Sequence, residues 1–166
     1  GGMDKALLHT STFGGNNLAC AAGIAALKVI VEKNLAKEAE EKGEYLLSKL
    51  QELKGRYPII KEVRGRGLMI GLELKGSNNT VLNTLTGGTL ENLAREYFAS
   101  LVAGQLLNEY HIITAYTLNN PNVIRVEPAL TIEYQQMDKL IEALEEIFYN
   151  NKGFIKMAFS TLKNVL

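Results

Sequence analysis

The stretch VRGRGLMIGLEL, residues 63–74, decides the fold. Leu68, Ile70, Leu72 and Leu74 recur at every second position, which is typical of a half-buried strand. Glycines alternate with arginines just before that run, so we expect strands over 59–63 and 68–74 around a bulge or turn. Two arginines beside glycines are also suited to binding a carboxylate or a phosphate. We prefer a strand pair with a glycine bulge and solvated arginines, and we assign no site there.

The residues before this stretch predict two helices of different character. Residues 18–31 are apolar almost all round, which predicts a helix buried on most sides and capped by Asn16 or Asn17. From residue 36 a one-faced pattern predicts an amphipathic helix that Pro58 ends. Its apolar positions are Ala39, Gly43, Leu46, Leu50, Leu53 and Tyr57.

The residues after this stretch alternate between helix and strand patterns. We expect a surface loop over 75–90, a helix over 91–109, strands over 111–116 and 123–127, a helix over 135–149 and a short helix within 152–166. This order predicts an α/β chain of the α+β kind, a mainly antiparallel sheet covered by helices. The helix over 18–31 has no obvious partner in that layer.

Composition excludes several classes of function. The chain has 166 residues, 46% of them hydrophobic, and its 18 basic side chains balance 18 acidic ones. The absence of net charge disfavours nucleic acid and anionic membrane as partners. One cysteine and two histidines supply neither a disulfide framework nor a metal cluster, which favours a reducing, cytoplasmic setting. No apolar run is long enough to span a bilayer.

The segment HTSTFGGNN, residues 9–17, gathers hydroxyl groups ahead of a helix. Thr10, Ser11 and Thr12 offer donors, and the unpaired N–H groups of a helix N-terminus favour an anion such as phosphate. The segment has no lysine and no P-loop spacing. The residue types alone are compatible with two interpretations of this segment, a hydroxyl-rich helix cap and an anion-binding site.

Arg125 lies inside the predicted strand over 123–127, where it shares a face with Glu127. A guanidinium fixed on rigid backbone suits bidentate binding of a carboxylate, and an intramolecular pair with Glu127 or another acidic residue explains it equally well. Cys20, within an apolar helix, is interpreted as a packing residue because neither His9 nor His111 is placed to act as its base.

Three blocks in order and spacing resemble the C-terminal part of class III pyridoxal-phosphate-dependent aminotransferases, most closely the putrescine and ornithine type. The blocks are LLHTSTFGGNNLACAAGIAAL at 7–27, VRGRGLMIGLEL at 63–74 and NVIRVEPALTIEYQQMDKLIEAL at 122–144. The resemblance covers about residues 5–148. It implies the type I aminotransferase fold and a homodimer with active sites at the subunit interface.

The resemblance also implies domains and site residues. Residues 1–34 would be the end of the large cofactor-binding domain, 35–150 the small domain and 151–166 a C-terminal extension. Thr12, together with Ser11, would contact the phosphate of pyridoxal 5'-phosphate in the neighbouring subunit, and Arg125 would hold the α-carboxylate of the substrate. No metal is implied. Asn17 and Ala129 replace prolines that are common in the family.

The resemblance implies amino-group transfer from an amine or amino acid, putrescine- or ornithine-like, to an oxo acid. The lysine that forms the Schiff base with the cofactor lies upstream of the family's STFGGN motif, and here only Lys5 precedes that motif, too close to it. We therefore expect the chain by itself to be inactive. The alternatives are a stand-alone binding or oligomerisation module with the same fold and, more remotely, an unrelated phosphate-binding protein.

Overall fold

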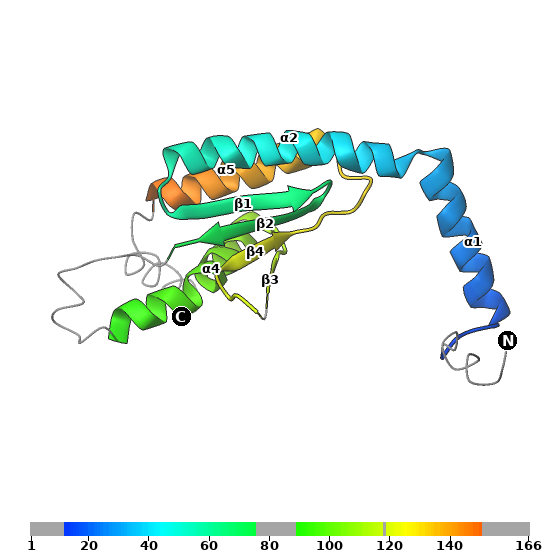
Figure 1. The fold of residues 1–166 in the computed structure, drawn as a ribbon, viewed down its shortest axis with the longest axis horizontal. Helices are drawn as coiled ribbons and strands as arrows, with labels where there is room; N and C mark the ends of the chain where they lie inside the picture. Colours follow the sequence, from blue (N-terminus) through cyan, green and yellow to red (C-terminus); the bar gives the residue numbers. More distant parts are fainter. Residues whose placement is uncertain (1–11, 76–88, 118, 151–166) are drawn as a thin grey trace, which may run out of the picture. The chain divides into compact units, whose positions relative to one another are not determined.

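The computed structural model describes residues 12–75, 89–117 and 119–150, in two compact units that are described one at a time (Figure 1). The first unit is Gly1–Lys37 and the second is Glu38–Leu166. Ser11, most of the loop expected over 75–90 and the short helix expected within 152–166 lie outside the described residues.

The first unit contains helix α1, Asn17–Glu32. Asn16 is its N-cap, because the Asn16 side-chain oxygen accepts a hydrogen bond from the Ala19 backbone N–H at 3.0 Å. The helix predicted over 18–31 is confirmed, but the prediction that it is buried is wrong, since α1 buries none of its side chains. Cys20 is exposed as well, so it is not the packing residue we expected. A helix that is apolar all round needs covering surfaces that this unit does not supply.

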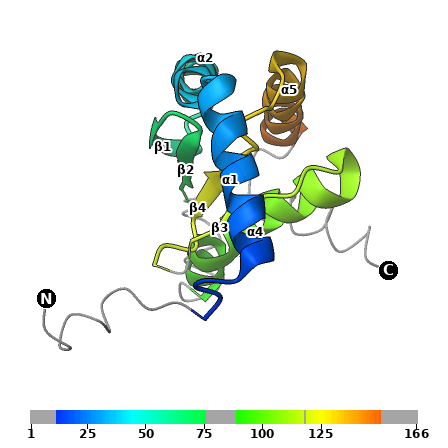
Figure 2. The same ribbon diagram turned by 90° about the vertical axis from the view of Figure 1, so that its right-hand side faces the viewer.

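The second unit is built on an antiparallel sheet with strand order β1-β2-β4-β3. The strands are β1 (Ile60–Arg66), β2 (Met69–Leu74), β3 (Ala115–Tyr116) and β4 (Val123–Val126). The strand pair expected around the glycines is the β1–β2 hairpin, and its turn uses Gly67 with φ +53°. Figure 2 views the same unit from the side.

Three helices cover one face of this sheet: α2 (Leu35–Arg56), α4 (Thr89–Tyr110) and α5 (Tyr134–Asn150). Side chains from alternate positions of β2 and β4 enter a shared core with the helices. These are Ile70, Leu72, Leu74, Ile124 and Val126. The predicted antiparallel sheet covered by helices is therefore confirmed, and the opposite face of the sheet is left for polar side chains.

The strand expected over 111–116 is shorter than predicted. Only Ala115 and Tyr116 pair with β4. His111 takes a left-handed conformation with φ +57° at the end of α4, and its N–H donates to the Leu107 carbonyl at 3.2 Å. The backbone of His111 therefore closes the helix instead of extending the sheet.

Polar contacts also join α2 to α5. The Tyr45 hydroxyl donates to the Asp138 carboxylate at 2.5 Å, and the Tyr45 ring meets Tyr134 edge-on with ring centres 5.0 Å apart. Near the end of α2, the Arg56 guanidinium pairs with the Glu145 carboxylate. The two helices run in the same direction, since the later residue of α2 meets the later residue of α5.

Candidate functional site

Arg125 occupies the middle of the polar sheet face. Its strand neighbours Ile124 and Val126 are buried, and alternation therefore directs Arg125 away from the helices. Across the sheet it pairs with Gly71 of β2 and Ala115 of β3. Its side chain is 45% exposed. Because the guanidinium is half exposed and its strand neighbours are small, a ligand carboxylate can reach it.

The Arg125 guanidinium is engaged by Glu127, just beyond the end of β4. Arg125 Nε donates to Glu127 Oε1 at 3.0 Å, and a terminal guanidinium nitrogen donates to Oε2. This hydrogen-bonded pairing lowers the pKa of Glu127 and raises that of Arg125. The sequence left open an intramolecular pair or a binding role, and the structure contains the pair on an exposed surface.

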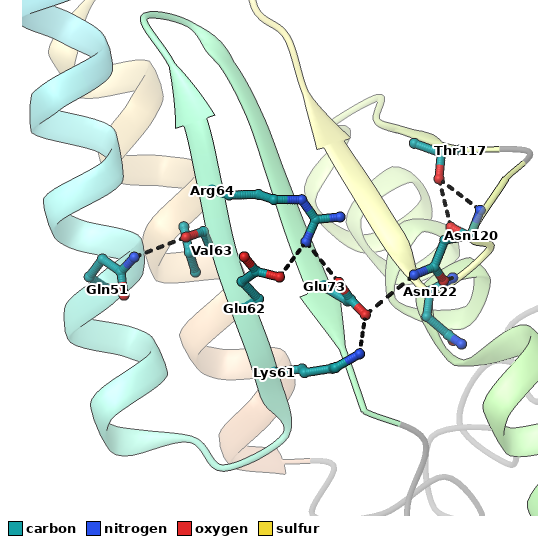
Figure 3. Close-up of polar contacts among 9 residues, drawn as sticks. All are labelled: Gln51, Lys61, Glu62, Val63, Arg64, Glu73, Thr117, Asn120 and Asn122. Atoms are coloured by element: carbon teal, nitrogen blue, oxygen red, sulfur yellow. Dashed lines mark hydrogen bonds and ion pairs between the residues drawn. The ribbon is translucent and has the colours of Figure 1, made fainter.

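A second arginine, Arg64 of β1, lies on the same face in a tighter arrangement (Figure 3). Its NH1 atom donates to Glu62 at 2.8 Å and to Glu73 at 2.7 Å. The expectation of a solvated arginine is therefore incomplete, because Arg64 is half exposed but bound to two carboxylates. Both contacts use NH1, and the one to Glu73 joins Arg64 to a buried carboxylate.

Glu73 of β2 is the polar residue that sequence reasoning missed. It is only 7% exposed, and Lys61 Nζ donates to its carboxylate at 2.6 Å. Bonds from Lys61 and then Arg64 lower the pKa of Glu73 to about 2. Its place among leucines at period two predicted a residue on the polar face, but nothing in that pattern predicted burial.

The Glu73 carboxylate also orders the turn before β4. Asn120 Nδ2 donates to Glu73 Oε1 at 3.3 Å, and the Thr117 hydroxyl donates to the Asn120 carbonyl at 2.7 Å (Figure 3). These contacts link β2 to the residues that lead into Val123 and Arg125. The network therefore supports the strand that carries the candidate carboxylate-binding residue.

A cavity of about 570 Å³ adjoins the same strand. Its wall includes Arg125 and Glu127, the end of α4 and the apolar side of α5, including Met137 and Leu140. Tyr110 lies in this wall, where burial first and then a hydrogen bond with Glu146 raise its pKa to about 12.

Thr12 lies in the exposed turn that leads into α1. Gly15, with φ +79°, makes the last bend before the Asn16 cap, and the first turn of α1 carries no acidic residue. An exposed hydroxyl next to a helix N-terminus is chemically suited to a phosphate. Ser11, which is also expected to contact the cofactor phosphate, lies outside the described residues.

Other site classes receive no support from the described ranges. Within 12–75, 89–117 and 119–150, no three His, Cys, Asp or Glu side chains are grouped so that they could hold a metal ion. In the same ranges, no helix has the length and apolar character needed to cross a membrane.

Comparison with known proteins gives the family. The family model described as aminotransferase class-III matches residues 2–148. The chain belongs to the class III aminotransferase family. The predicted resemblance is thereby confirmed, and the family is one of enzymes that transfer amino groups and use pyridoxal phosphate.

Solved structures of aminotransferases resemble this chain over most of its length. Acetylornithine aminotransferase from Elizabethkingia anophelis is 27% identical with a TM-score of 0.68, over 86% of this chain and 32% of that one. Ornithine aminotransferase from Toxoplasma gondii is 31% identical with a TM-score of 0.64, over 85% and 29%. A pyridoxal-phosphate-bound amine transaminase from an uncultivated Pseudomonas species is 28% identical with a TM-score of 0.66, over 89% and 31%. The chain therefore spans about a third of the length of these solved structures.

Proposed function

We propose that this chain is part of a pyridoxal-phosphate-dependent transaminase in which Arg125 binds the α-carboxylate of an amino or oxo acid. The amino donor would be an amine or amino acid of the putrescine or ornithine type, and the acceptor an oxo acid. The observation that carries the proposal is the position of Arg125. It projects from the polar sheet face, half exposed, within the region that matches the class III family.

The proposed division of the chain follows the family resemblance. Residues 1–34 would close the large domain, residues 35–150 would form the small domain and residues 151–166 would extend beyond it. The complete enzyme would be a cytoplasmic homodimer with each active site shared between subunits. In that arrangement Thr12 and Ser11 would serve the cofactor of the neighbouring subunit.

The chemistry around Thr12 fits the phosphate of the cofactor. Thr12 is exposed. The N–H groups in the first turn of α1 have no acceptor inside the helix, and the Ala19 N–H is bound instead by the side chain of the cap residue Asn16. No carboxylate in that turn would repel an anion. Bound pyridoxal phosphate would supply the carbonyl carbon that accepts the amino group and a ring that withdraws electrons.

The phosphate role can be tested on the chain itself by titrating inorganic phosphate and following the backbone amide signals of residues 12–19 by NMR. We expect saturable shifts that disappear in Thr12→Val and persist in Thr12→Ser, which keeps the hydroxyl. Equal shifts in both variants would rule out a role for the Thr12 hydroxyl.

The inactivity of the isolated chain has a separate test. The chain is incubated with pyridoxal phosphate, reduced with borohydride and mapped by mass spectrometry, with the Toxoplasma gondii ornithine aminotransferase as the positive control. Because no lysine here matches the family's Schiff-base lysine, we expect no single lysine to be labelled selectively. Selective labelling of one lysine would contradict the proposal.

The alternative is a stand-alone binding or oligomerisation module. The closed core of the second unit is compatible with it. However, α1 and the turn before it expose large apolar side chains, including Phe13 at 74%, Leu18 at 81% and Val31 at 76%. Such exposure is characteristic of a surface that needs a covering partner. A monomer that stays soluble and binds no apolar dye would favour the module, whereas dye binding and aggregation would favour part of a larger enzyme.

A further inference from the structure

Gly71 lies inside β2, between two arginines on the polar face of the sheet. It pairs with Arg64 in the β1–β2 register and with Arg125 in the β2–β4 register. Its neighbours in the strand, Ile70 and Leu72, are buried in the core, so a side chain at residue 71 would project toward the polar face. Since adjacent strands are about 4.8 Å apart, the Cα atoms of the two arginines are separated by about 10 Å. A position without a side chain therefore lies between two long ones.

The contacts of the described residues do not require glycine at this position. In the same hairpin, a Cβ on Gly65 would be 2.4 Å from the Met69 carbonyl oxygen, which is backbone and cannot rotate away. A Cβ on Gly71 would be 3.3 Å from Val123 Cγ1 and 3.9 Å from Arg64 Cγ and the Arg64 carbonyl oxygen. A small shift of the Val123 methyl group would accommodate it. Glycine weakens a strand interior, and it often marks a place where a ligand approaches the backbone closely.

The two arginines differ in what they offer to a ligand beside this glycine. Arg64 is fixed, because its NH1 atom donates at 2.7 Å to Glu73, which is only 7% exposed. Its aliphatic part therefore forms a wall on one side of Gly71. Arg125, on the other side, is 45% exposed and accessible to a carboxylate. Across β4 from Gly71, β3 already places the methyl group of Ala115 beside Arg125. A molecule bound to Arg125 by its carboxylate thus has more room over β2 than over β3.

We infer that Gly71 is a specificity-determining residue, whose missing side chain makes room for carboxylates that are substituted at the carbon next to the carboxylate group. The inference rests on the proposed carboxylate-binding role of Arg125. Amino and oxo acids belong to this class, because they carry their nitrogen or oxygen and the rest of the molecule on that carbon. A methyl group on residue 71 would occupy the space that such a substituent needs, while a carboxylate with a bare methyl group would still fit.

The test titrates acetate and the branched isobutyrate into the full chain and follows backbone amide signals and the Arg125 Nε–H signal by NMR. We expect the two dissociation constants to agree within about twofold in the unsubstituted chain. In Gly71→Ala we expect acetate binding to change by less than about twofold and isobutyrate binding to weaken at least about fivefold, because the added methyl group fills the space. Gly55→Ala is the matched control, since a Cβ there meets nothing within 4 Å, and its ratio should stay unchanged.

Arg125→Gln separates failure of this inference from failure of the proposed function, and far-UV circular dichroism verifies that each variant is folded. If both carboxylates bind Arg125→Gln as they bind the unsubstituted chain, the carboxylate-binding role itself is wrong. If binding is lost in Arg125→Gln but the ratio of the two constants is the same with and without Gly71→Ala, Arg125 binds carboxylates and the role of Gly71 is wrong.

The unsubstituted chain decides the matter even where Gly71→Ala does not fold. Isobutyrate binding at least about fivefold weaker than acetate binding would overturn the inference, because glycine would then leave no room for a branched ligand. Equal affinities for the two carboxylates, lost together in Arg125→Gln, would support it. A change of ratio in Gly55→Ala as large as that in Gly71→Ala would also overturn it, since the effect would not depend on space beside Arg125.

Discussion

Gly43 of α2 lies directly against Gly67 in the turn between β1 and β2. A Cβ on residue 43 would be 2.3 Å from both the carbonyl carbon and the carbonyl oxygen of Gly67. The obstacle is backbone, which cannot rotate away as a flexible side chain would. The helix and the hairpin are therefore in contact at a point where only glycine fits.

Substitution at this contact should destabilise the fold. We expect Gly43→Ala to lower the free energy of unfolding by about 2–3 kcal/mol, because α2 must move away from the turn. Gly55→Ala in the same helix is the control, since a Cβ there meets nothing within 4 Å and alanine is the better helix former. Urea denaturation measures both. Equal stability of the two variants would show that the helix shifts without cost.

Glu73 should make stability depend on acid pH. Its pKa in the folded protein, about 2, is below its ordinary value near 4.3, so the native state stabilises the charged form. The contribution is fully present above about pH 5 and is lost as the pH falls from about 4.3 to about 2. We expect Glu73→Gln to be about 2 kcal/mol less stable at pH 7 and nearly equal to the unsubstituted chain near pH 2.

The control for this prediction is Glu62→Gln, which removes the exposed partner of Arg64. Urea midpoints are compared from pH 7 to pH 2. We expect Glu62→Gln to cost less than about 1 kcal/mol at pH 7. A constant difference between Glu73→Gln and the unsubstituted chain over the whole range would contradict the assignment of the shift to Glu73.

The hydrogen bond between Tyr45 and Asp138 should contribute measurably to the packing of α2 on α5. Tyr45→Phe keeps the edge-on contact with Tyr134 but removes the donor to a carboxylate. We expect a loss of about 1–2 kcal/mol. A double-mutant cycle with Asp138→Ala isolates the coupling energy. A coupling energy near zero would mean that solvent replaces the bond at no cost.

Asn16, and not Asn17, should control the start of α1. The Asn16 side chain holds the Ala19 N–H, whereas Asn17 is already the first residue of the helix. We expect Asn16→Ala to cost about 1 kcal/mol of helix stability and Asn17→Ala to cost little. Amide hydrogen exchange of residues 18–22 measures the local opening. Faster exchange in Asn17→Ala than in Asn16→Ala would contradict the capping assignment.

The elements with strong periodicity could be predicted from the sequence because local pattern and final burial agree. Leu46, Leu50 and Leu53 repeat at helical spacing, and Ile70 and Leu72 at strand spacing, and all are buried where the pattern places them. The start of the strand after α4 was predicted less well, because the left-handed backbone at His111 depends on how the chain leaves the helix. The exposure of α1 was also missed, since an apolar pattern does not say whether its partner is present.

The candidate site could be predicted only in part. Strand alternation correctly placed Arg125 and Glu127 on one polar face, but whether the two side chains pair depends on rotamers that no sequence pattern specifies. The buried Glu73 network depends on Lys61 and Asn120, which come from separate segments. These hydrogen bonds to Glu73 form only when β1, β2 and the turn before β4 come together in the fold.

The contacts between α2 and α5 have a consequence for how the chain folds. They join residues 93 and 89 positions apart, Tyr45 with Asp138 and Arg56 with Glu145. Closing such long loops is slow, and it has to wait until α5 exists. During synthesis the side of α2 that packs on α5 stays open to solvent until the ribosome has released residues up to about Phe148. The arrival of α5, the last described helix, is therefore the step that covers this side of α2.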